Sequence, residues 1–328
     1  MKLGICCISA LGWRTVKRRW AQVFPEATFY DPEPSPLLCK IGQKTLAKSL
    51  GMRRAVRQAI RDGCDRVLIA TNGEATLVPL ADAQKVAIYG DASHRQLDEL
   101  YGFGRPEHKN ASRERALRRL FASGARGLAM STWAVEGFLR DYGDTAHHIP
   151  GCVDTTLFRP GSTRPDGPFR VLFVGGNLAR KGAQLAIDAT ADLPGVELLI
   201  VGGTLESPPP HVRCAGWVEG DSPAMVAAYQ SADLFLFPTT ADCYSHVIIE
   251  AQACGVPVMA SVTGGIRDLI VDGETGIEIT GLDAVHVRDR IAAFREHPPG
   301  ALSENAHKRI LGLHSFHKQS FFIYNALQ

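Results

Sequence analysis

The sequence of 328 residues lacks the features that mark several large protein classes. It has no run of about 18 apolar residues, so no transmembrane helix is expected. None of the eight cysteines forms a Cys-x-x-Cys pair, and several lie within apolar runs, where cysteine behaves as a small hydrophobic residue. These absences argue against a zinc site and favour a reduced, cytoplasmic protein.

Two nucleotide-binding fingerprints are also missing. The sequence has neither the G-x-G-x-x-G spacing of dinucleotide-binding folds nor the G-x-x-x-x-G-K-[ST] loop of P-loop proteins. A dehydrogenase and a P-loop ATPase are therefore disfavoured. The apolar stretch at residues 1–8 is short and is followed by basic residues without a small-residue cleavage pattern. It predicts a buried first strand rather than a signal peptide.

Short apolar runs alternate with helical stretches in both halves, which is the pattern of parallel α/β proteins. The length predicts two domains of about 150 residues each. We expect them at residues 1–150 and 151–310, with a closing helix at 311–328 that packs back on the first domain. The Gly- and Pro-rich segment 153–168 is predicted to link the domains.

The predicted elements fall into two successive series. Strands are expected at residues 3–8, 28–30, 66–70, 86–89, 127–131 and 147–149, and then at 170–174, 196–201, 234–237 and 256–260. Helices are expected at residues 15–23, 44–61, 113–122 and 133–142, and then at 182–192 and 246–253. Ligands of doubly wound sheets bind beyond the carboxyl ends of the strands, so a cleft between the halves is the expected site.

The net charge is only +2, but it is unevenly distributed. Residues 1–150 contain 23 Lys and Arg against 15 Asp and Glu, a difference of +8, and the remaining residues contain 13 against 19, a difference of −6. This asymmetry indicates either an anionic partner for the first half, such as a membrane surface or a phosphorylated acceptor, or a solvated basic face with no partner. Nucleic acid is not the expected partner.

One candidate site follows the first strand of the second series. The segment 174–182 contains three glycines, with Arg180 and Lys181 just before the last of them, and runs into a predicted helix. Glycines allow close backbone approach to a ligand, and a helix start offers unpaired N–H groups. Cations are disfavoured at a helix start unless an anion compensates them. The pattern therefore indicates a diphosphate site or, alternatively, two exposed basic residues at a turn.

A second candidate site lies in the segment 238–258, where a strand ends and a short loop leads into an apolar helix. Asp242 lies in the loop, and Glu250 lies eight positions later in the helix. An unpaired carboxylate in such a helix is costly. A pair of ligand hydroxyls, as on a ribose, would satisfy Glu250, and so would an internal donor.

This segment resembles the E-x7-E signature of the retaining GT-B glycosyltransferases, especially the family 4 group (glycosyl transferases group 1). The resemblance covers residues 127–280 and is weak before them. It implies an α/β fold of two Rossmann-like, doubly wound domains facing a cleft, with a nucleotide-sugar donor held by the second and no metal. Supporting motifs stand at residues 131–134, 149–160, 176–182, 201–203, 214–218, 229–238 and 263–270.

The resemblance implies roles for matching positions. Arg180 and Lys181 would hold the donor diphosphate and supply charge to the leaving group. Asp242, which stands where the family usually has Glu, would bind a hydroxyl of the donor sugar, and Glu250 would bind the ribose. The other implied donor-binding residues are Gly176, Asn177, Gly216, Trp217, Val218, Tyr244, Ser245 and His246. Of these, Asn177 stands near a position where many family members have Arg.

The first domain offers fewer candidates. Gly12 follows the first predicted strand and fits a loop that an acceptor approaches. Asp91 and His94 follow another predicted strand, and residues there face the reacting sugar in related enzymes. Asp91 is assigned a catalytic role and His94 an acceptor-side role, with an ordinary surface loop as the alternative.

Two basic segments of the first domain remain ambiguous. Residues 13–20 combine two tryptophans with four cations, which suits a membrane interface or an anionic acceptor, but equally a helix that packs on the sheet. The predicted helix at 44–61 presents the same alternatives. The His- and aromatic-rich tail is expected to pack rather than bind metal.

We expect a retaining glycosyltransferase that moves a sugar from a nucleoside-diphosphate sugar, UDP rather than GDP, to an acceptor hydroxyl. The acceptor is expected to be a sugar or a lipid-linked or otherwise anionic molecule of envelope polysaccharide or glycolipid synthesis. The expected location is cytoplasmic or peripheral at the inner face of the membrane, and no cofactor is expected. The alternatives are a nucleotide-sugar epimerase on the same scaffold and a non-catalytic nucleotide- or carbohydrate-binding protein.

Overall fold

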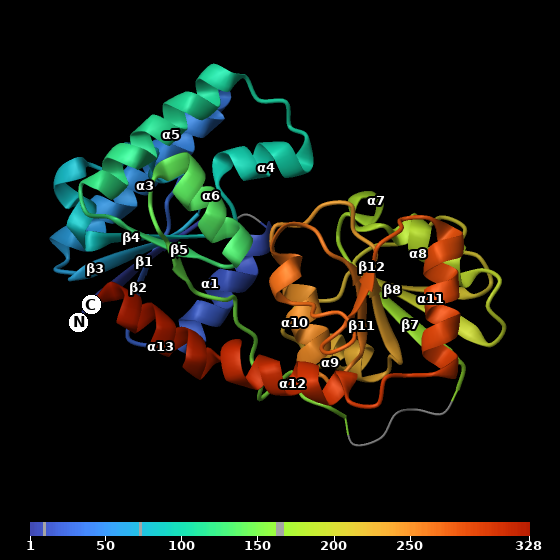
Figure 1. Ribbon diagram of the computed structural model, residues 1–328. Helices are drawn as coiled ribbons and strands as arrows, with labels where there is room; N and C mark the ends of the chain where they lie inside the picture. Colours follow the sequence, from blue (N-terminus) through green and yellow to red (C-terminus); the bar gives the residue numbers. More distant parts are fainter. Residues whose placement is uncertain (9–10, 72–73, 162–166) are drawn as a thin grey trace. The chain divides into compact units, whose positions relative to one another are not determined.

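The computed structural model describes residues 1–8, 11–71, 74–161 and 167–328. Its contacts divide the chain into two compact units (Figure 1). Unit 1 contains Met1–Gly151 and Phe316–Gln328, and unit 2 contains Cys152–Ser315. Part of the predicted linker, residues 162–166, lies outside the described residues.

Unit 1 is built on a parallel sheet with the strand order β2-β1-β3-β4-β5-β6. The central strands are continuous apolar runs because helices cover both of their faces. β3 and β4, for example, pair along Val67–Val86 to Ala70–Tyr89, and nearly all of their residues are buried. The strands are β1 (Leu3–Cys7), β2 (Thr28–Tyr30), β3 (Arg66–Ala70), β4 (Val86–Gly90), β5 (Arg126–Ala129) and β6 (His147–His148).

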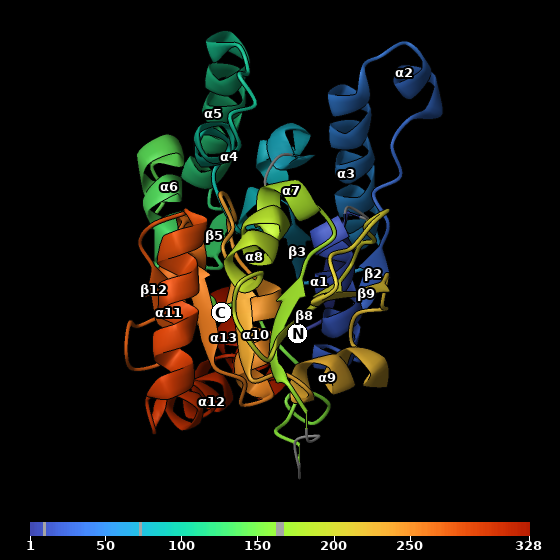
Figure 2. The ribbon, with the colours of Figure 1, turned by 90° about the vertical axis from the view of Figure 1, so that its right-hand side faces the viewer.

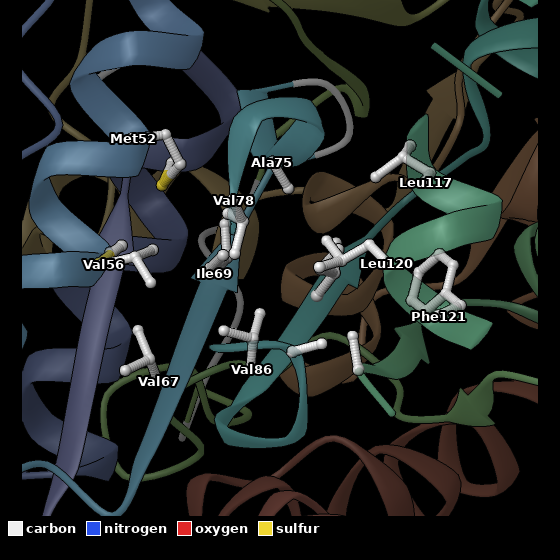
Figure 3. Close-up of a cluster of buried hydrophobic side chains, with 14 of the residues drawn as sticks. Met52, Val56, Val67, Ile69, Ala75, Val78, Val86, Leu117, Leu120 and Phe121 are labelled. Carbon is white, nitrogen blue, oxygen red and sulfur yellow. The ribbon is translucent and has the colours of Figure 1, made fainter. Parts of the chain in front are cut away.

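Two groups of helices cover the faces of this sheet (Figure 1). On one face, a core of Met52, Val56, Ile69, Val86 and Leu120 joins two long helices to the strands (Figure 3). The helices of unit 1 are α1 (Leu11–Val23), α2 (Pro36–Lys40), α3 (Lys44–Arg61), α4 (His94–Tyr101), α5 (Glu107–Ala122), α6 (Thr132–Tyr142) and α13 (Phe316–Leu327), with 3₁₀ turns η1 (Glu74–Leu77) and η2 (Leu80–Lys85).

The last helix of the chain, α13, packs on the sheet of unit 1 beside α1. The indole N–H of Trp20 donates to the side-chain oxygen of Gln319 at 2.9 Å, and the Gln319 amide donates to the Tyr89 hydroxyl at 3.1 Å and to the Pro150 carbonyl at 3.0 Å. The Trp20 ring lies 5.0 Å from the Tyr89 ring. A chain segment 299 residues distant from Trp20 thus completes the core of unit 1.

This arrangement decides between the alternatives for residues 13–20. Trp20 is fully buried and Arg19 is 1% exposed, so this part of α1 is a packing face. The segment is a helix that packs on the sheet, and its buried Arg19 does not belong to a basic outer face.

Unit 2 repeats the architecture with the strand order β12-β11-β10-β7-β8-β9, again parallel. Its strands are β7 (Phe169–Val174), β8 (Val196–Val201), β9 (Val212–Gly216), β10 (Leu234–Phe237), β11 (Val258–Ser261) and β12 (Ile277–Ile279). Its helices are α7 (Leu178–Lys181), α8 (Ala183–Thr190), α9 (Pro223–Gln230), α10 (His246–Ala253), α11 (Ala284–Glu296) and α12 (Leu302–Leu313), with the 3₁₀ turn η3 (Gly264–Asp268). One core joins α8 and α11 to the sheet, and Figure 2 shows these two helices together on the same side.

The predicted fold class is confirmed, because both units are parallel α/β structures with helices on the two faces of the sheet. β2, β3, β8, β10, α3 and α10 have the predicted bounds. Several details differ. The helix expected at 182–192 is α8, and the short α7 that precedes it was not predicted. Strands β9 and β12 and helices α2, α4, α9, α11 and α12 were not predicted either, and Gly12 lies in the first turn of α1 rather than in a loop.

Candidate functional site

The candidate donor site lies where the strand order of unit 2 reverses. From β7, the chain runs outward through β8 and β9 on one side and through β10, β11 and β12 on the other. Because the strands are parallel, the loops that follow β7 and β10 leave the same edge of the sheet side by side. Such a switch point is the usual ligand site of a doubly wound fold.

The loop after β7 is held in shape by a cap and a glycine. The Asn177 side chain accepts a hydrogen bond from the Arg180 N–H at 3.1 Å and so caps the short helix α7. Gly182 follows with φ +83°, and a Cβ there would overlap the carbonyl oxygen of Pro238. Only glycine meets both demands. Arg180 and Lys181 therefore end α7, and they lie just before α8 rather than within the start of one long helix.

Lys181 and Asp242 form an ion pair across the switch point. Their side chains are only 14% and 10% exposed, and the ammonium of Lys181 also lies 4.9 Å from the centre of the Phe237 ring. Burial lowers the pKa of Lys181 below its ordinary value, and Asp242 opposes this shift. A desolvated ammonium attracts anions more strongly than a hydrated one does.

Arg180 joins the same two loops through its backbone and its side chain. Its carbonyl accepts hydrogen bonds from the Thr240 N–H and hydroxyl, both at 3.1 Å, and from the Thr239 hydroxyl at 3.2 Å. Its guanidinium donates to the Ala241 carbonyl. The two basic residues are thus fixed against the loop that carries Asp242.

The N-terminus of α10 completes this edge of the site. Ser245 is the N-cap residue and is buried, yet its hydroxyl forms no hydrogen bond with any residue that the structure describes. The preceding Tyr244 donates to or accepts from His314 Nδ1 at 3.2 Å, and its ring lies edge-on to His246 at 5.6 Å. A helix N-terminus with an unused buried hydroxyl is suited to an anionic ligand or a bound water.

A tight turn supports the loop that carries Asp242. The Gly265 N–H donates to the Cys243 carbonyl at 2.8 Å, and Gly264 has φ +56° and lies so close to the Asp242 carbonyl that a Cβ would overlap it. The motif at 263–270 thus acts through the backbone, by positioning the 242–245 segment.

Glu250 is buried in α10, at 6% exposure. The Tyr229 hydroxyl of α9 donates to its carboxylate at 2.8 Å. Of the two ways to satisfy this carboxylate, the structure provides the internal donor. The bond also holds the carboxylate in one orientation, which a ribose-binding group needs.

The strand ends on the other side of β7 bring a third part of the site together. The Gly202 N–H donates to the Gly216 carbonyl at 2.8 Å, and Gly216 adopts φ +67° where β9 ends. Trp217 follows with 68% of its surface exposed, and its ring edge lies 3.7 Å from a Cβ built on Gly176. Val218 is half-buried. An exposed indole beside a glycine leaves space for a flat ring to stack.

In unit 1, the end of β4 places Asp91 and His94 near the start of α4. Asp91 is half-buried, and His94 is 3% exposed. The backbone N–H of His94 donates to the Tyr142 oxygen at 2.8 Å, and His94 Nδ1 lies 2.7 Å from the same oxygen. We assign the tautomer in which the Tyr142 hydroxyl donates to Nδ1 and the proton of the neutral ring is on Nε2.

His94 is neutral at ordinary pH. Burial, followed by the neighbouring Arg113 and Arg105, lowers the pKa of His94 to about 3. Its Nε2 is buried and has no hydrogen-bond partner among the described residues. His94 is thus a neutral donor available to a ligand. Sequence reasoning missed its partner Tyr142, as well as Tyr229 and His314, because each of them acts through a contact distant along the chain.

The described parts of the chain contain no group of three or more His, Cys, Asp or Glu that could hold a metal ion. Within the same residues, every helix is too short or too polar to span a bilayer.

Part of the chain that carries this site is similar to a known family. Residues 168–296 match the family Glycosyl transferases group 1. A D-inositol 3-phosphate glycosyltransferase of Mycolicibacterium smegmatis is 33% identical over 182 residues, which cover 49% of this chain and 41% of that protein. The match thus spans less than half of the relative's length.

Solved structures share the fold of the whole chain. The sucrose-phosphate synthase of Thermosynechococcus elongatus superposes with a TM-score of 0.79 at 18% identity, covering 99% of this chain and 98% of its own. Anabaena HepE, solved in complex with UDP-glucose, gives a TM-score of 0.73 at 18% identity, covering 100% and 99%. At this identity the likeness shows the fold, which is that of the GT-B glycosyltransferases, as the sequence predicted.

Replacing Asp242 by Asn should destabilise the protein and make its stability depend on pH. At pH 7 the variant should lose about 3 kcal/mol in its free energy of unfolding, because a buried ammonium is left without its counter-charge. The pKa of Lys181 is already lower in the folded than in the unfolded protein, so the folded state gains stability as the pH rises. Losing Asp242 lowers that pKa further, and part of the loss should return by pH 9. Urea unfolding at both pH values measures this.

The matched control is the double variant Lys181→Met with Asp242→Asn, which removes both charges. It should lose less stability than Asp242→Asn alone and show no recovery at pH 9. If Asp242→Asn costs less than about 1 kcal/mol at pH 7, the pair behaves as a hydrated surface pair and its described burial is wrong.

Proposed function

Since residues 168–296 match the family Glycosyl transferases group 1, we propose that the protein is a retaining glycosyltransferase. It transfers a sugar from a nucleoside-diphosphate sugar to an acceptor hydroxyl. The observation that carries the proposal is the arrangement at the switch point of unit 2. There, a desolvated Lys181 and the N-terminus of α10 meet beside Asp242 and a buried, oriented Glu250.

The donor is assigned to these residues by chemistry. Arg180 and Lys181 bind the diphosphate, with the N–H groups of Tyr244, Ser245 and His246 and the unused Ser245 hydroxyl as further donors. Glu250 accepts from the ribose hydroxyls, held in place by Tyr229. The base stacks near Trp217 and is lined by Gly176, Asn177, Gly216 and Val218. UDP is the proposed nucleotide, in keeping with the UDP-glucose bound by HepE.

The proposed reaction proceeds on one face of the donor sugar. The bond between the anomeric carbon and the diphosphate oxygen breaks, and the acceptor oxygen bonds to that carbon from the same side. The acceptor proton passes to the departing phosphate oxygen. Lys181 and Arg180 stabilise the negative charge that develops on the diphosphate. These fixed cations and the helix N-terminus fill the role that a metal has in other transferases, so we propose a reaction without a metal or cofactor.

Asp242, Asp91 and His94 are assigned to the reacting sugar and the acceptor. Asp242 orients a donor-sugar hydroxyl while it pairs with Lys181. Neutral His94 donates from Nε2, and Asp91 orients a hydroxyl or stabilises positive charge at the anomeric carbon. Gly12, in the first turn of α1, remains an acceptor-side position, where the backbone would contact the ligand because glycine has no side chain.

We also propose that the protein works in the cytoplasm and touches the inner face of a membrane through unit 1, in glycolipid or envelope polysaccharide synthesis. Residues 34–61 contain seven Lys and Arg and no Asp or Glu. Leu37 on α2, Ile41 directly after α2 and Leu46 at the start of α3 are 70%, 64% and 42% exposed. Figure 2 shows α2 at the tip of α3. Exposed aliphatic side chains among cations suit an anionic bilayer better than a nucleic acid.

A cavity of about 290 Å³ lies beside this basic surface. It is lined by Ser35 and Leu50 and by three arginines of α3, Arg53, Arg54 and Arg57. Three arginines at one cavity fit the head group of an anionic lipid.

Donor binding is the first prediction of the proposed function. Calorimetry with a panel of UDP- and GDP-sugars in the presence of EDTA should detect one donor that binds tightly. Lys181→Ala and Glu250→Ala should each weaken it by about tenfold or more, because each removes a charged partner of the ligand. The control is Lys308→Ala, which removes an exposed cation of α12. If the folded protein binds no nucleotide sugar, the transferase proposal is wrong.

Product stereochemistry is the second prediction. NMR of the glycoside product should show the anomeric configuration of the donor, because attack and departure share one face. An inverted centre would rule out this mechanism. The same reaction without acceptor should leave the nucleotide sugar unchanged; formation of a second nucleotide sugar would instead identify an epimerase.

Membrane contact is the third prediction. Co-sedimentation with vesicles of phosphatidylglycerol and phosphatidylcholine should pull down the protein, and binding should weaken as salt is raised. Replacing both Leu37 and Ile41 by Ser should reduce binding several-fold, because the variant loses its inserted apolar groups. The exposed Leu282 and Val285 of unit 2, replaced in the same way, serve as control. Equal binding of both variants would contradict the proposed surface.

A further inference from the structure

Three polar side-chain atoms are buried without hydrogen-bond partners in one region of unit 1. They are His94 Nε2, Arg105 Nη1 and Asn110 Oδ1, and none of them bonds to any residue that the structure describes. Each such atom costs about 1–3 kcal/mol if it stays unsatisfied. Three of them together therefore call for a ligand or ordered water in that place.

The three residues come from α4, α5 and the segment between them, and one carboxylate ties two of them together. Asp98 of α4 accepts from the Arg105 N–H at 3.1 Å and from the Asn110 amide at 3.3 Å. With its N–H₂ group used in this way, Asn110 has its oxygen left as an acceptor. His94 is fixed by Tyr142 and has its donor left over.

Both arginines and carboxylates act in this region: Arg105, Arg113 and Asp141 act on His94, and Asp98 lies beside Arg105 and Asn110. Arg113 of α5 interacts with both His94 and Arg105, and burial, followed by the nearby Arg105, lowers the pKa of Arg113. The Arg113 guanidinium donates to the Thr45 hydroxyl at 3.5 Å, and Glu74 acts on Arg113 from further away. Two neighbouring guanidinium groups repel each other, and an anion that both of them contact stabilises the pair.

We propose that this cluster, His94, Arg105, Asn110 and Arg113, binds a phosphate-type group of the acceptor. The two guanidinium groups match the oxygens of a phosphate, and the neutral imidazole supplies one more N–H. Asn110 Oδ1 accepts from a neighbouring hydroxyl, so the ligand class is a phosphorylated sugar or polyol. That this ligand is the acceptor rests on the proposed function, whereas the binding of an anion at the cluster is independent of it.

The arrangement also explains why a neutral histidine belongs there. A protonated imidazole beside two arginines would add a third positive charge to a desolvated region, and the surroundings keep the ring neutral down to a pKa of about 3. The neutral ring donates through Nε2 at every physiological pH. Binding of a phosphate dianion at this cluster would therefore not depend on His94 titration between pH 6 and 8.

The test is a calorimetric titration of the full chain with inorganic phosphate and, separately, with glucose 6-phosphate. Arg105→Gln and Arg113→Gln should each weaken the binding of both ligands by about tenfold, because each removes a charge-assisted hydrogen-bond donor. The matched control is Arg115→Gln, which removes an exposed charge from the same helix α5. Asn110→Leu should weaken glucose 6-phosphate more than inorganic phosphate, since only the sugar phosphate offers a hydroxyl.

A second arm distinguishes the source of the phosphate. Vesicles of phosphatidylinositol in phosphatidylcholine present the same chemistry on a lipid. Loss of vesicle binding in Arg105→Gln without loss in Arg115→Gln assigns the cluster to a lipid-linked phosphate. Loss that is confined to the soluble ligands assigns it to a free sugar phosphate.

Three outcomes would overturn the proposal. These are no binding of any phosphate probe to the folded wild type, an equal effect of Arg115→Gln, and binding that is unchanged in Arg105→Gln and Arg113→Gln. In each case the orphaned atoms are satisfied by water. UDP-sugar binding, measured on the same variants, should remain unchanged. Intact donor binding with no phosphate binding would reject this cluster alone, whereas loss of donor binding in the wild type rejects the proposed function.

Discussion

The buried ion pair of Lys181 and Asp242 is the interaction on which the candidate site depends. It joins the loops after β7 and β10, the two strands at which the order of the sheet reverses. Burying two charges is costly, and their attraction repays the cost only when the geometry and the surrounding polar contacts are good. Here Phe237 covers the ammonium, and the bonds of Arg180 fix the loop beside it. The ammonium stays poorly solvated, so an arriving diphosphate gains more from it than from a surface lysine.

Much of this could be predicted from the sequence, for local reasons. β10 is a continuous apolar run, and β8 is one apart from Glu197, so their bounds follow from the local sequence. Asp242 and Lys181 were singled out individually by their loops. Their pairing across 61 residues could not be predicted, because it follows from strand order rather than from any local pattern. The requirement for glycine at position 182 could not be predicted for the same reason, since the group that imposes it is the distant carbonyl of Pro238.

In unit 1, the properties of His94 could not be predicted from the sequence. His94 was identified because it follows a strand, but its properties come from Tyr142, Arg105 and Arg113, which lie on or before other helices. An isolated histidine on a loop would titrate near pH 6.5. Burial between arginines makes His94 a permanent neutral donor. The chemistry of the residue was therefore hidden until the packing of α4, α5 and α6 was known.

The donor diphosphate, an anion, is assigned to the half of the chain that is negatively charged, and the positions of the charges explain why. The half with net charge −6 is the one to which the donor diphosphate is assigned. Three of its buried or partly buried acids, however, have local partners: Glu197 bonds Arg170 and Arg213, Glu250 accepts from Tyr229, and Asp242 pairs with Lys181. A bound anion interacts at short range with Lys181, Arg180 and the start of α10. Net charge acts at longer range, on how a charged partner approaches. The positive charge of unit 1 is thus better suited to gathering an anionic acceptor or membrane, while a few buried groups decide where the donor is held.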